Sequence, residues 1–213
     1  MNFEDFSSSL SKIENLPLPG SRAHLAMAPE LRIRELAGLD SQRKSPRRAG
    51  VLVLFYPGHD SGTRLLLIRR PSYPGVHSNQ IALPGGKEEA DDPDLQHTAL
   101  REAREEVGVP PRQVRVVRAL SPVYIPPSNF EVSPFVGLSA GRPDFRRQES
   151  EVAELIEVPV TQLLSREFLE VRRMTTSYAT DIEVPAFLLN GHVVWGATAM
   201  MLNELKSLLE EVL

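Results

Sequence analysis

The most informative part of the sequence is Arg101-Glu102-Ala103-Arg104-Glu105-Glu106-Val107-Gly108-Val109, together with the earlier pair Gly85-Gly86. Glu102, Glu105 and Glu106 are spaced i, i+3 and i+4, so a helix would project their carboxylates from one face. Three like charges this close repel one another, and helix stability does not require them. A hard divalent cation removes the conflict, because magnesium and manganese prefer oxygen ligands. The stretch therefore indicates a metal-binding helix.

The ends of this helix are also marked in the sequence. Asp92 is a good N-cap, Pro93 suits the first helical position, and Gly108 suits a left-handed C-terminal residue. The side of the helix away from the glutamates carries small or apolar residues that would let it approach a sheet closely. These are Leu95, Ala99, Ala103 and Val107.

A solvated charged helix face is the alternative interpretation of an isolated acidic cluster. Here the cluster is not isolated, because Gly85 and Gly86 precede the helix by a short acidic loop. Glycines at such a point supply backbone carbonyls and allow a close approach where a phosphate-bound metal would sit. We therefore favour a site over a bare surface.

The rest of the chain predicts strands mixed with helices. Strands are expected at residues 51–56, 64–69, 114–125, 132–139, 152–158, 182–189 and 192–195. The last two flank Asn190-Gly191, a strong hairpin signal. Helices are expected at 159–164 and from about residue 197 onward. Two helical pieces are expected before residue 49, around Pro17-Leu18-Pro19-Gly20. We predict an α/β protein with a mixed sheet between helical layers, formed by residues 50–213 behind a helical extension, 1–49.

Composition narrows the class of protein. The chain has 213 residues, enough for one substantial core, and a net charge of −4, which gives no general attraction to nucleic acid. It lacks cysteine, so a metal must be held by oxygen or imidazole. No apolar run of about 18 residues predicts a membrane span, and the N-terminus does not resemble a secretory signal. We expect a cytoplasmic protein that binds a small phosphate-containing ligand, with no nucleic acid and no membrane.

The stretch 101–109, with Gly86 before it, resembles the Nudix box, in which Arg-Glu-apolar-x-Glu-Glu-x-Gly-apolar forms the end of the motif. The resemblance implies an α/β/α sandwich and a Mg²⁺- or Mn²⁺-dependent hydrolase of diphosphate linkages. It implies that Glu102, Glu105, Glu106 and Gly86 hold the metals and that Arg101 supports them. One departure is a single extra residue between Gly86 and Arg101. The loop glutamate of the box falls on Pro93, so Asp92 or Asp94 stands in or the position is vacant.

The surrounding sequence resembles the coenzyme A pyrophosphatase branch of that family. The shared segments are Leu65-Leu66-Leu67-Ile68-Arg69-Arg70, residues 80–86, Thr98-Ala99-Leu100 and Trp195-Gly196-Ala197-Thr198-Ala199. The resemblance implies cleavage of coenzyme A to phosphopantetheine and adenosine 3′,5′-bisphosphate, and a homodimer is consistent with it. The branch has arginine, glycine and phenylalanine where this chain has Gly75, Asn79 and Leu83. Arg69, Arg70 and Gly85 are the expected substrate-binding residues, and Arg69, Arg70 or His77 would replace the missing arginine.

The expected reaction is attack of water on one phosphorus, with metal ions neutralising the phosphate oxygens and lowering the pKa of the water. Glu105 or another nearby carboxylate would accept the proton. Glu151 is a candidate fourth acidic ligand, because it lies at a loop-to-strand junction; a surface acid is the other interpretation, and Glu149 the substitute. Two other functions remain open, hydrolysis of ADP-ribose or a similar derivative, and a Nudix-fold module that binds nucleotide without cleaving it.

Overall fold

A computed structural model describes residues 1–38, 45–74, 77–176 and 179–213. Within these residues, eight strands form one sheet and three form another. The strands are β1 (Arg47–Pro57), β2 (Thr63–Arg69), β3 (Ile81–Ala82), β4 (Gly85–Lys87), β5 (Arg115–Ala119), β6 (Val123–Ile125), β7 (Phe130–Leu138), β8 (Glu154–Pro159), β9 (Leu169–Met174), β10 (Ile182–Leu189) and β11 (His192–Trp195). The helices are α1 (Phe3–Leu10), α2 (Ser21–Leu25), α3 (Glu30–Gly38), α4 (Leu95–Val107), α5 (Val160–Leu164) and α6 (Gly196–Glu210). Four 3₁₀ turns, η1 (Ser11–Asn15), η2 (Pro111–Gln113), η3 (Pro126–Ser128) and η4 (Arg166–Phe168), complete these described elements.

The large sheet is mixed, as the sequence predicted. Its main path is β3-β2-β1-β7-β5, and β4, β6 and β8 pair with β1, β7 and β2. The central pair β1 and β7 is parallel, whereas the other strand pairs described are antiparallel. The small sheet has the order β11-β10-β9. Asn190 and Gly191 both have positive φ, 48° and 79°, as the expected tight hairpin between β10 and β11 requires.

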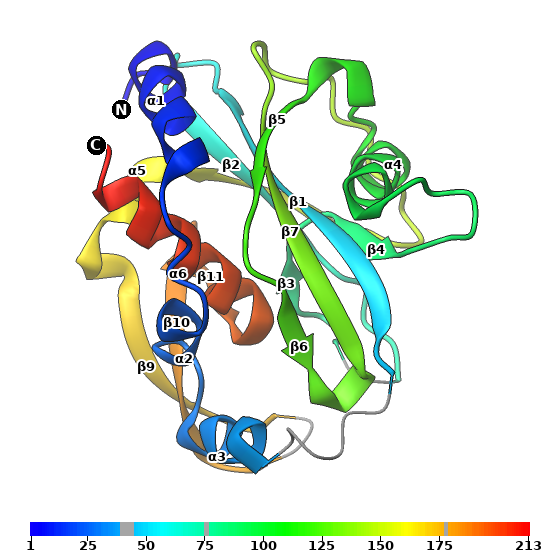
Figure 1. The fold of residues 1–213 in the computed structure, drawn as a ribbon, viewed down its shortest axis with the longest axis vertical. Coiled ribbons are helices and arrows are strands. Elements are labelled where there is room, and N and C mark those ends of the chain that lie inside the picture. Colours follow the sequence, from blue (N-terminus) through cyan, green and yellow to red (C-terminus); the bar gives the residue numbers. More distant parts are fainter. Residues whose placement is uncertain (39–44, 75–76, 177–178) are drawn as a thin grey trace.

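Helices cover both faces of the large sheet, which gives the expected α/β/α sandwich (Figure 1). Strand β1 is buried on both faces, so its residues form a continuous apolar run instead of alternating with polar ones. Leu52, Leu54 and Tyr56 pack on the α4 side, and Val51, Val53 and Phe55 pack on the α6 side. None of the helices in the described ranges is long and apolar enough to span a bilayer.

The N-terminal helices form part of this core. Phe6, Leu10, Ile13 and Met27 are almost fully buried on the α6 side, and the Phe6 and Phe55 ring centroids lie 4.8 Å apart. The described helices within residues 1–38 thus contribute to the core. The division between 49 and 50 remains a prediction, and β1 already begins at Arg47.

Several predicted boundaries were wrong, for local reasons. The strand expected at 114–125 divides into β5 and β6 around Pro122, which has no N–H for a strand ladder. Strand β9 was not predicted, because its Leu-Glu-Val-Arg-Arg-Met sequence is exposed and mixes charge with apolar side chains. The segment 152–158 pairs from Glu154 onward. Strand β1 begins at Arg47, earlier than the strand expected at 51–56.

Helix α4 begins two residues later than predicted. Its N-cap is Asp94, whose carboxylate accepts a hydrogen bond of 2.9 Å from the His97 backbone N–H. Asp92 does not cap the helix, because its carboxylate is bound by Arg101 and Thr98. Gly108 is the left-handed C-cap, with φ of 76°, as predicted.

Candidate active site

Helix α4 and the loop before β8 bring three carboxylates together. One oxygen each of Glu102, Glu106 and Glu151 lies within 4.8 Å of the others, and we call these residues the carboxylate cluster. Glu106 is buried, with 3% of its surface exposed, Glu102 is half-buried and Glu151 is exposed. The cluster therefore reaches from the interior of the protein to its surface.

Glu105 lies outside this cluster. Successive helix residues are about 100° apart around the axis, so Glu105 and Glu106 diverge although both were assigned to one face. The Glu105 carboxylate is 45% exposed and accepts a hydrogen bond of 3.0 Å from Arg101 Nη1. The structure thus divides the three glutamates that the sequence grouped, and the role of Glu105 as a ligand or base remains a prediction.

The glycine pair in β4 lies against the cluster. The Gly85 backbone N–H donates a hydrogen bond of 2.8 Å to Glu106 Oε2. A Cβ at Gly86 would come within 2.4 Å of Glu102 Oε1, so any other residue at that position would displace this carboxylate. Gly85 has φ of 151° and would clash with the Gly50 carbonyl oxygen at 2.4 Å if it carried a Cβ. The β1 backbone therefore requires glycine at 85, whereas glycine at 86 leaves room for the Glu102 carboxylate.

Two carboxylates of the cluster have a raised pKa in the fold. Burial raises the pKa of Glu106 to about 7, although the Gly85 N–H and the charge of Arg70 oppose the shift. Burial also raises the pKa of Glu102, against the opposing effect of Arg101. In both residues the neighbouring carboxylates, Glu151 among them, add to the rise. A site that disfavours its own negative charges in this way suits a cation.

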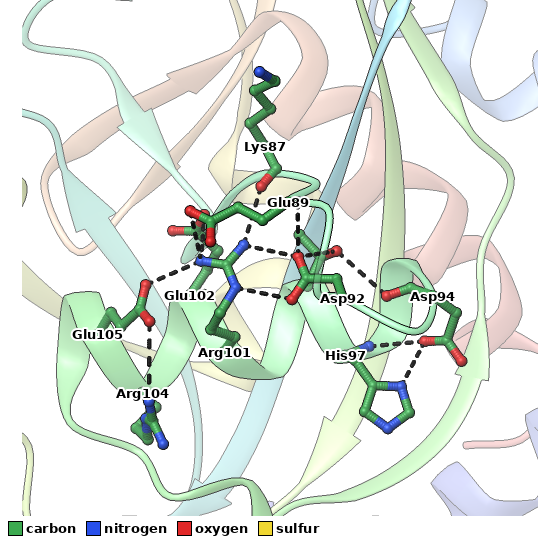
Figure 2. A network of polar contacts seen from close by, with 10 residues as sticks. Lys87, Glu89, Asp92, Asp94, His97, Arg101, Glu102, Arg104 and Glu105 are labelled. Carbon is green, nitrogen blue, oxygen red and sulfur yellow. Dashed lines mark hydrogen bonds and ion pairs between the residues drawn. The ribbon is translucent and has the colours of Figure 1, made fainter.

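Arg101 is held by a network of acids and backbone oxygens (Figure 2). Its Nε and Nη2 each donate a hydrogen bond of 2.9 Å to the Asp92 carboxylate, and Nη1 donates to Glu102 at 3.1 Å. Nη2 also donates to the Lys87 carbonyl at 3.1 Å, which joins α4 to β4. Hydrogen bonds from Arg101 hold the pKa of Asp92 below its usual range. Asp92 is therefore engaged in positioning Arg101, and Asp94 in capping the helix, so neither has the arrangement of a loop ligand.

The loop that carries Glu151 is fixed to the C-terminal end of α4. The Arg146 and Gln148 N–H groups donate to the Val107 and Glu106 carbonyl oxygens at 3.0 and 2.9 Å, and the Glu151 N–H donates to the Gln148 carbonyl. These bonds bring Glu151 to the cluster across a long separation in sequence. Glu149 is 84% exposed and lies near Arg147. The structure thus places Glu151 where a shared ligand must lie, while its role as a ligand remains a prediction.

A cavity of about 290 Å³ adjoins the cluster through β4. The three carboxylates do not line it, but Gly85, Gly86, Lys87 and Arg70 do. Arg70 Nη2 lies 3.5 Å from the Gly85 carbonyl oxygen, at the point where cavity and cluster meet. The described walls do not include Arg69, whose guanidinium binds Glu154 and Asn79 at 2.9 and 3.0 Å. Of the two arginines proposed for substrate, Arg70 is thus the better placed.

Most of the cavity wall is apolar and comes from distant parts of the chain. Residues 124–128 and Phe130 line it, and so does His77. Trp195, expected in the strand 192–195, is the last residue of β11 and lines the cavity just before α6. Arg32 and Met200, also in the wall, were missed, because no local pattern marks a residue that meets the site only through tertiary packing. Gly75, where the branch has arginine, lies outside the described residues.

Comparison with known proteins agrees with the geometry. The model of the NUDIX domain matches residues 46–178, more than half of the chain. The chain belongs to the Nudix family. This Nudix chain is similar to a protein named "Uncharacterized Nudix hydrolase NudL" from Pectobacterium atrosepticum, with 38% identity over 75% of this chain and 81% of the relative. It is 36% identical to "Nudix hydrolase 15, mitochondrial" of Arabidopsis thaliana, over 60% of this chain and 45% of the relative.

Among solved structures, the chain is similar to a MutT protein from Methanosarcina mazei Go1. The TM-score is 0.50 with 17% identity, over 77% of this chain and 95% of the other, a likeness of fold. The Nudix assignment and the sandwich fold predicted from the sequence are confirmed. The protein is a Nudix pyrophosphohydrolase acting on nucleotide derivatives, and its carboxylate cluster offers the oxygen donors that the divalent metals of such enzymes prefer.

Proposed function

We propose that this protein hydrolyses the diphosphate of coenzyme A to phosphopantetheine and adenosine 3′,5′-bisphosphate. The observation that carries the proposal is the junction at Gly85 and Gly86, where an acidic cluster meets an apolar cavity with basic residues in its wall. A substrate whose diphosphate joins a nucleotide to a long, weakly polar arm suits such a junction. The resemblance around Arg70, residues 80–86 and Trp195 supports this substrate, since these residues line the cavity.

Different residues would bind the metal and the diphosphate. Glu102, Glu106 and Glu151, with the Gly86 carbonyl, would hold Mg²⁺ or Mn²⁺, and three hard oxygen donors with crowded charge fit such an ion. The bound metal would neutralise phosphate oxygens and make water more acidic. Arg70, beside the Gly85 carbonyl, would bind the diphosphate on the cavity side of β4.

Proton transfer is assigned to the exposed part of the site. Glu105 is 45% exposed, one helical turn from Glu102, and is the candidate base that the sequence put forward. Arg101 holds it at 3.0 Å and also holds Glu102 at 3.1 Å, so Arg101 is a positioning residue for both acids. The reaction is direct attack by water, with no covalent intermediate.

Product analysis tests the substrate. Purified protein would be incubated with coenzyme A, ADP-ribose, NADH and diadenosine polyphosphates, each with Mg²⁺ or Mn²⁺, and the products would be separated by chromatography. We expect coenzyme A to give the highest kcat/KM and the two named products. A higher kcat/KM for ADP-ribose would favour ADP-ribose as the substrate. Binding without cleavage of any compound in the panel would favour a nucleotide-binding module.

A cytoplasmic location and a homodimer are further parts of the proposal, drawn from the sequence. Light scattering on the purified chain tests the dimer, for which a mass near twice 23.7 kDa is expected. Fluorescence microscopy of a tagged chain in its host tests the location.

A further inference from the structure

The charged residues in the cavity wall have a single sign. Among the described residues that line it, the charged side chains are Arg32, Arg70 and Lys87, whereas the whole chain has a net charge of −4. The remaining wall is largely apolar. Basic groups set in an apolar wall favour a ligand that carries anionic groups on an otherwise weakly polar body.

The two arginines in the wall come from different layers of the fold. Arg70 follows β2 and lies 3.5 Å from the Gly85 carbonyl, next to the carboxylate cluster. Arg32 lies in the first turn of α3, which is on the same side of the sheet as α6, whereas α4 with its glutamates lies on the other side (Figure 1). Arg32 therefore approaches the cavity from the side of the sheet opposite the cluster, whereas Arg70 lies next to the cluster.

Arg32 is an unusual residue for a helix of a surface extension. Its side chain is only 9% exposed, and its Nη1 donates a hydrogen bond of 2.6 Å to Glu35, whose side chain is 44% exposed. A buried guanidinium is tolerated only where hydrogen bonds satisfy it, and Glu35 supplies one of these bonds. The Glu35 contact also fixes the orientation of the guanidinium beside the cavity.

We propose that Arg32 is a specificity-determining residue that binds a second anionic group of the substrate, the 3′-phosphate on its adenosine half. This inference rests on the proposed function, since coenzyme A carries that monophosphate in addition to its diphosphate. A guanidinium suits a phosphate because it can donate two parallel hydrogen bonds. Trp195, in the same wall, offers an aromatic surface for the adenine. The N-terminal extension would thus select the substrate, while α4 and the Glu151 loop act on it.

Binding of two small nucleotides tests this without relying on catalysis. Adenosine 3′,5′-bisphosphate and adenosine 5′-monophosphate differ by one phosphate, and isothermal titration would give Kd for each in the same magnesium buffer. We expect the intact protein to bind the bisphosphate about tenfold or more tightly, the effect of one charge-assisted hydrogen bond or more. Arg32→Gln should reduce this ratio to within about threefold, and Arg32→Lys should give an intermediate ratio.

The matched control is Arg34→Gln, on the same helix, because the Arg34 side chain is 72% exposed and pairs with Glu30. This variant should keep the ratio of the intact protein. Equal weakening of both nucleotides by Arg32→Gln would show a structural role and overturn the inference, and so would an unchanged ratio. Binding and hydrolysis by the intact protein test the role of Arg32 and the coenzyme A activity separately. Preference for the bisphosphate without coenzyme A hydrolysis would refute the activity alone, and hydrolysis without that preference would refute the role of Arg32.

Discussion

Replacement of Glu106 by glutamine should stabilise the metal-free protein while it abolishes hydrolysis. Glutamine keeps the shape of the side chain and an oxygen that can accept the Gly85 N–H, now at 2.8 Å, but it carries no charge. The side chain is buried, so the wild-type carboxylate ionises at a free-energy cost that the variant does not have.

The magnitude follows from the pKa of Glu106, which burial raises from 4.5 to about 7. A raised pKa of an acid means that the folded protein binds a proton more tightly than the unfolded chain does. Below pH 4.5 Glu106 is protonated in both the folded and the unfolded state, and the free energy of unfolding is not reduced. As pH rises from 4.5 to 7, Glu106 ionises first in the unfolded state, so the free energy of unfolding falls. Above pH 7 the loss is complete, at about 3 kcal/mol, since one pKa unit corresponds to about 1.4 kcal/mol.

Urea unfolding in EDTA at pH 4.5 and pH 8.5 would measure this effect. The Glu106→Gln variant should exceed the wild type by about 1 to 3 kcal/mol at pH 8.5, and the difference should shrink toward zero at pH 4.5. Glu105→Gln is the matched control, because its side chain is 45% exposed and lies outside the cluster. A Glu106→Gln variant that is less stable at pH 8.5, or that hydrolyses normally, would show that the carboxylate has a structural role.

Three further predictions concern the surroundings of the cluster. Glu151→Gln should lower kcat/KM about tenfold or more and raise the metal concentration needed for half activity, whereas Glu149→Gln should change neither; equal effects would remove Glu151 from the ligand set. Asp92→Asn should lower kcat about tenfold and the free energy of unfolding by about 2 kcal/mol at pH 7, because Arg101 loses its charged partner. This loss of stability should shrink in acid, since the pKa of Asp92 is lowered in the fold. An unchanged kcat would contradict the positioning role. Glu204→Ala should destabilise the fold by about 3 to 5 kcal/mol in thermal or urea unfolding, because this buried acid joins α2 and α6, and a loss under 1 kcal/mol would contradict that account.

The pH dependence of the Glu204 effect has a defined sign. Burial alone would raise the pKa of Glu204, but hydrogen bonds from His24, Ser121 and the Gly20 N–H lower it below its usual value. The carboxylate therefore stabilises the fold at neutral pH, and this contribution is lost as pH falls below about 4.5. The difference between Glu204→Ala and the wild type should accordingly narrow in acid.

The sequence predicted those parts of the site that are local in the chain. The spacing of the glutamates, the C-cap at Gly108 and the Arg101–Glu105 pair all follow from helix geometry. Helix geometry did not show which glutamates face β4, because that depends on how α4 is rotated against the sheet. Glu105 and Glu106 are about 100° apart around the helix axis, so Glu106 is buried in the cluster whereas Glu105 is exposed.

The parts of the site that depend on packing could not be predicted in the same way. Arg32 in α3 and Trp195 at the end of β11 line one wall because α3 and α6 lie on the same side of the sheet, and no local spacing in the sequence indicates this. Glu151 was predicted only as a candidate, since its approach depends on backbone bonds between its loop and the end of α4. Strand β9 was missed because pairing with β10, and not an apolar pattern, makes it a strand.

The position of a bound divalent metal tests the central claim most directly. Crystals soaked in Mn²⁺ would be measured at a wavelength where manganese scatters anomalously, in parallel with assays in Mn²⁺ and in EDTA. We expect an anomalous peak between the carboxylates of Glu102, Glu106 and Glu151, and no hydrolysis in EDTA. A peak elsewhere in the molecule, or full hydrolysis in EDTA, would contradict that claim.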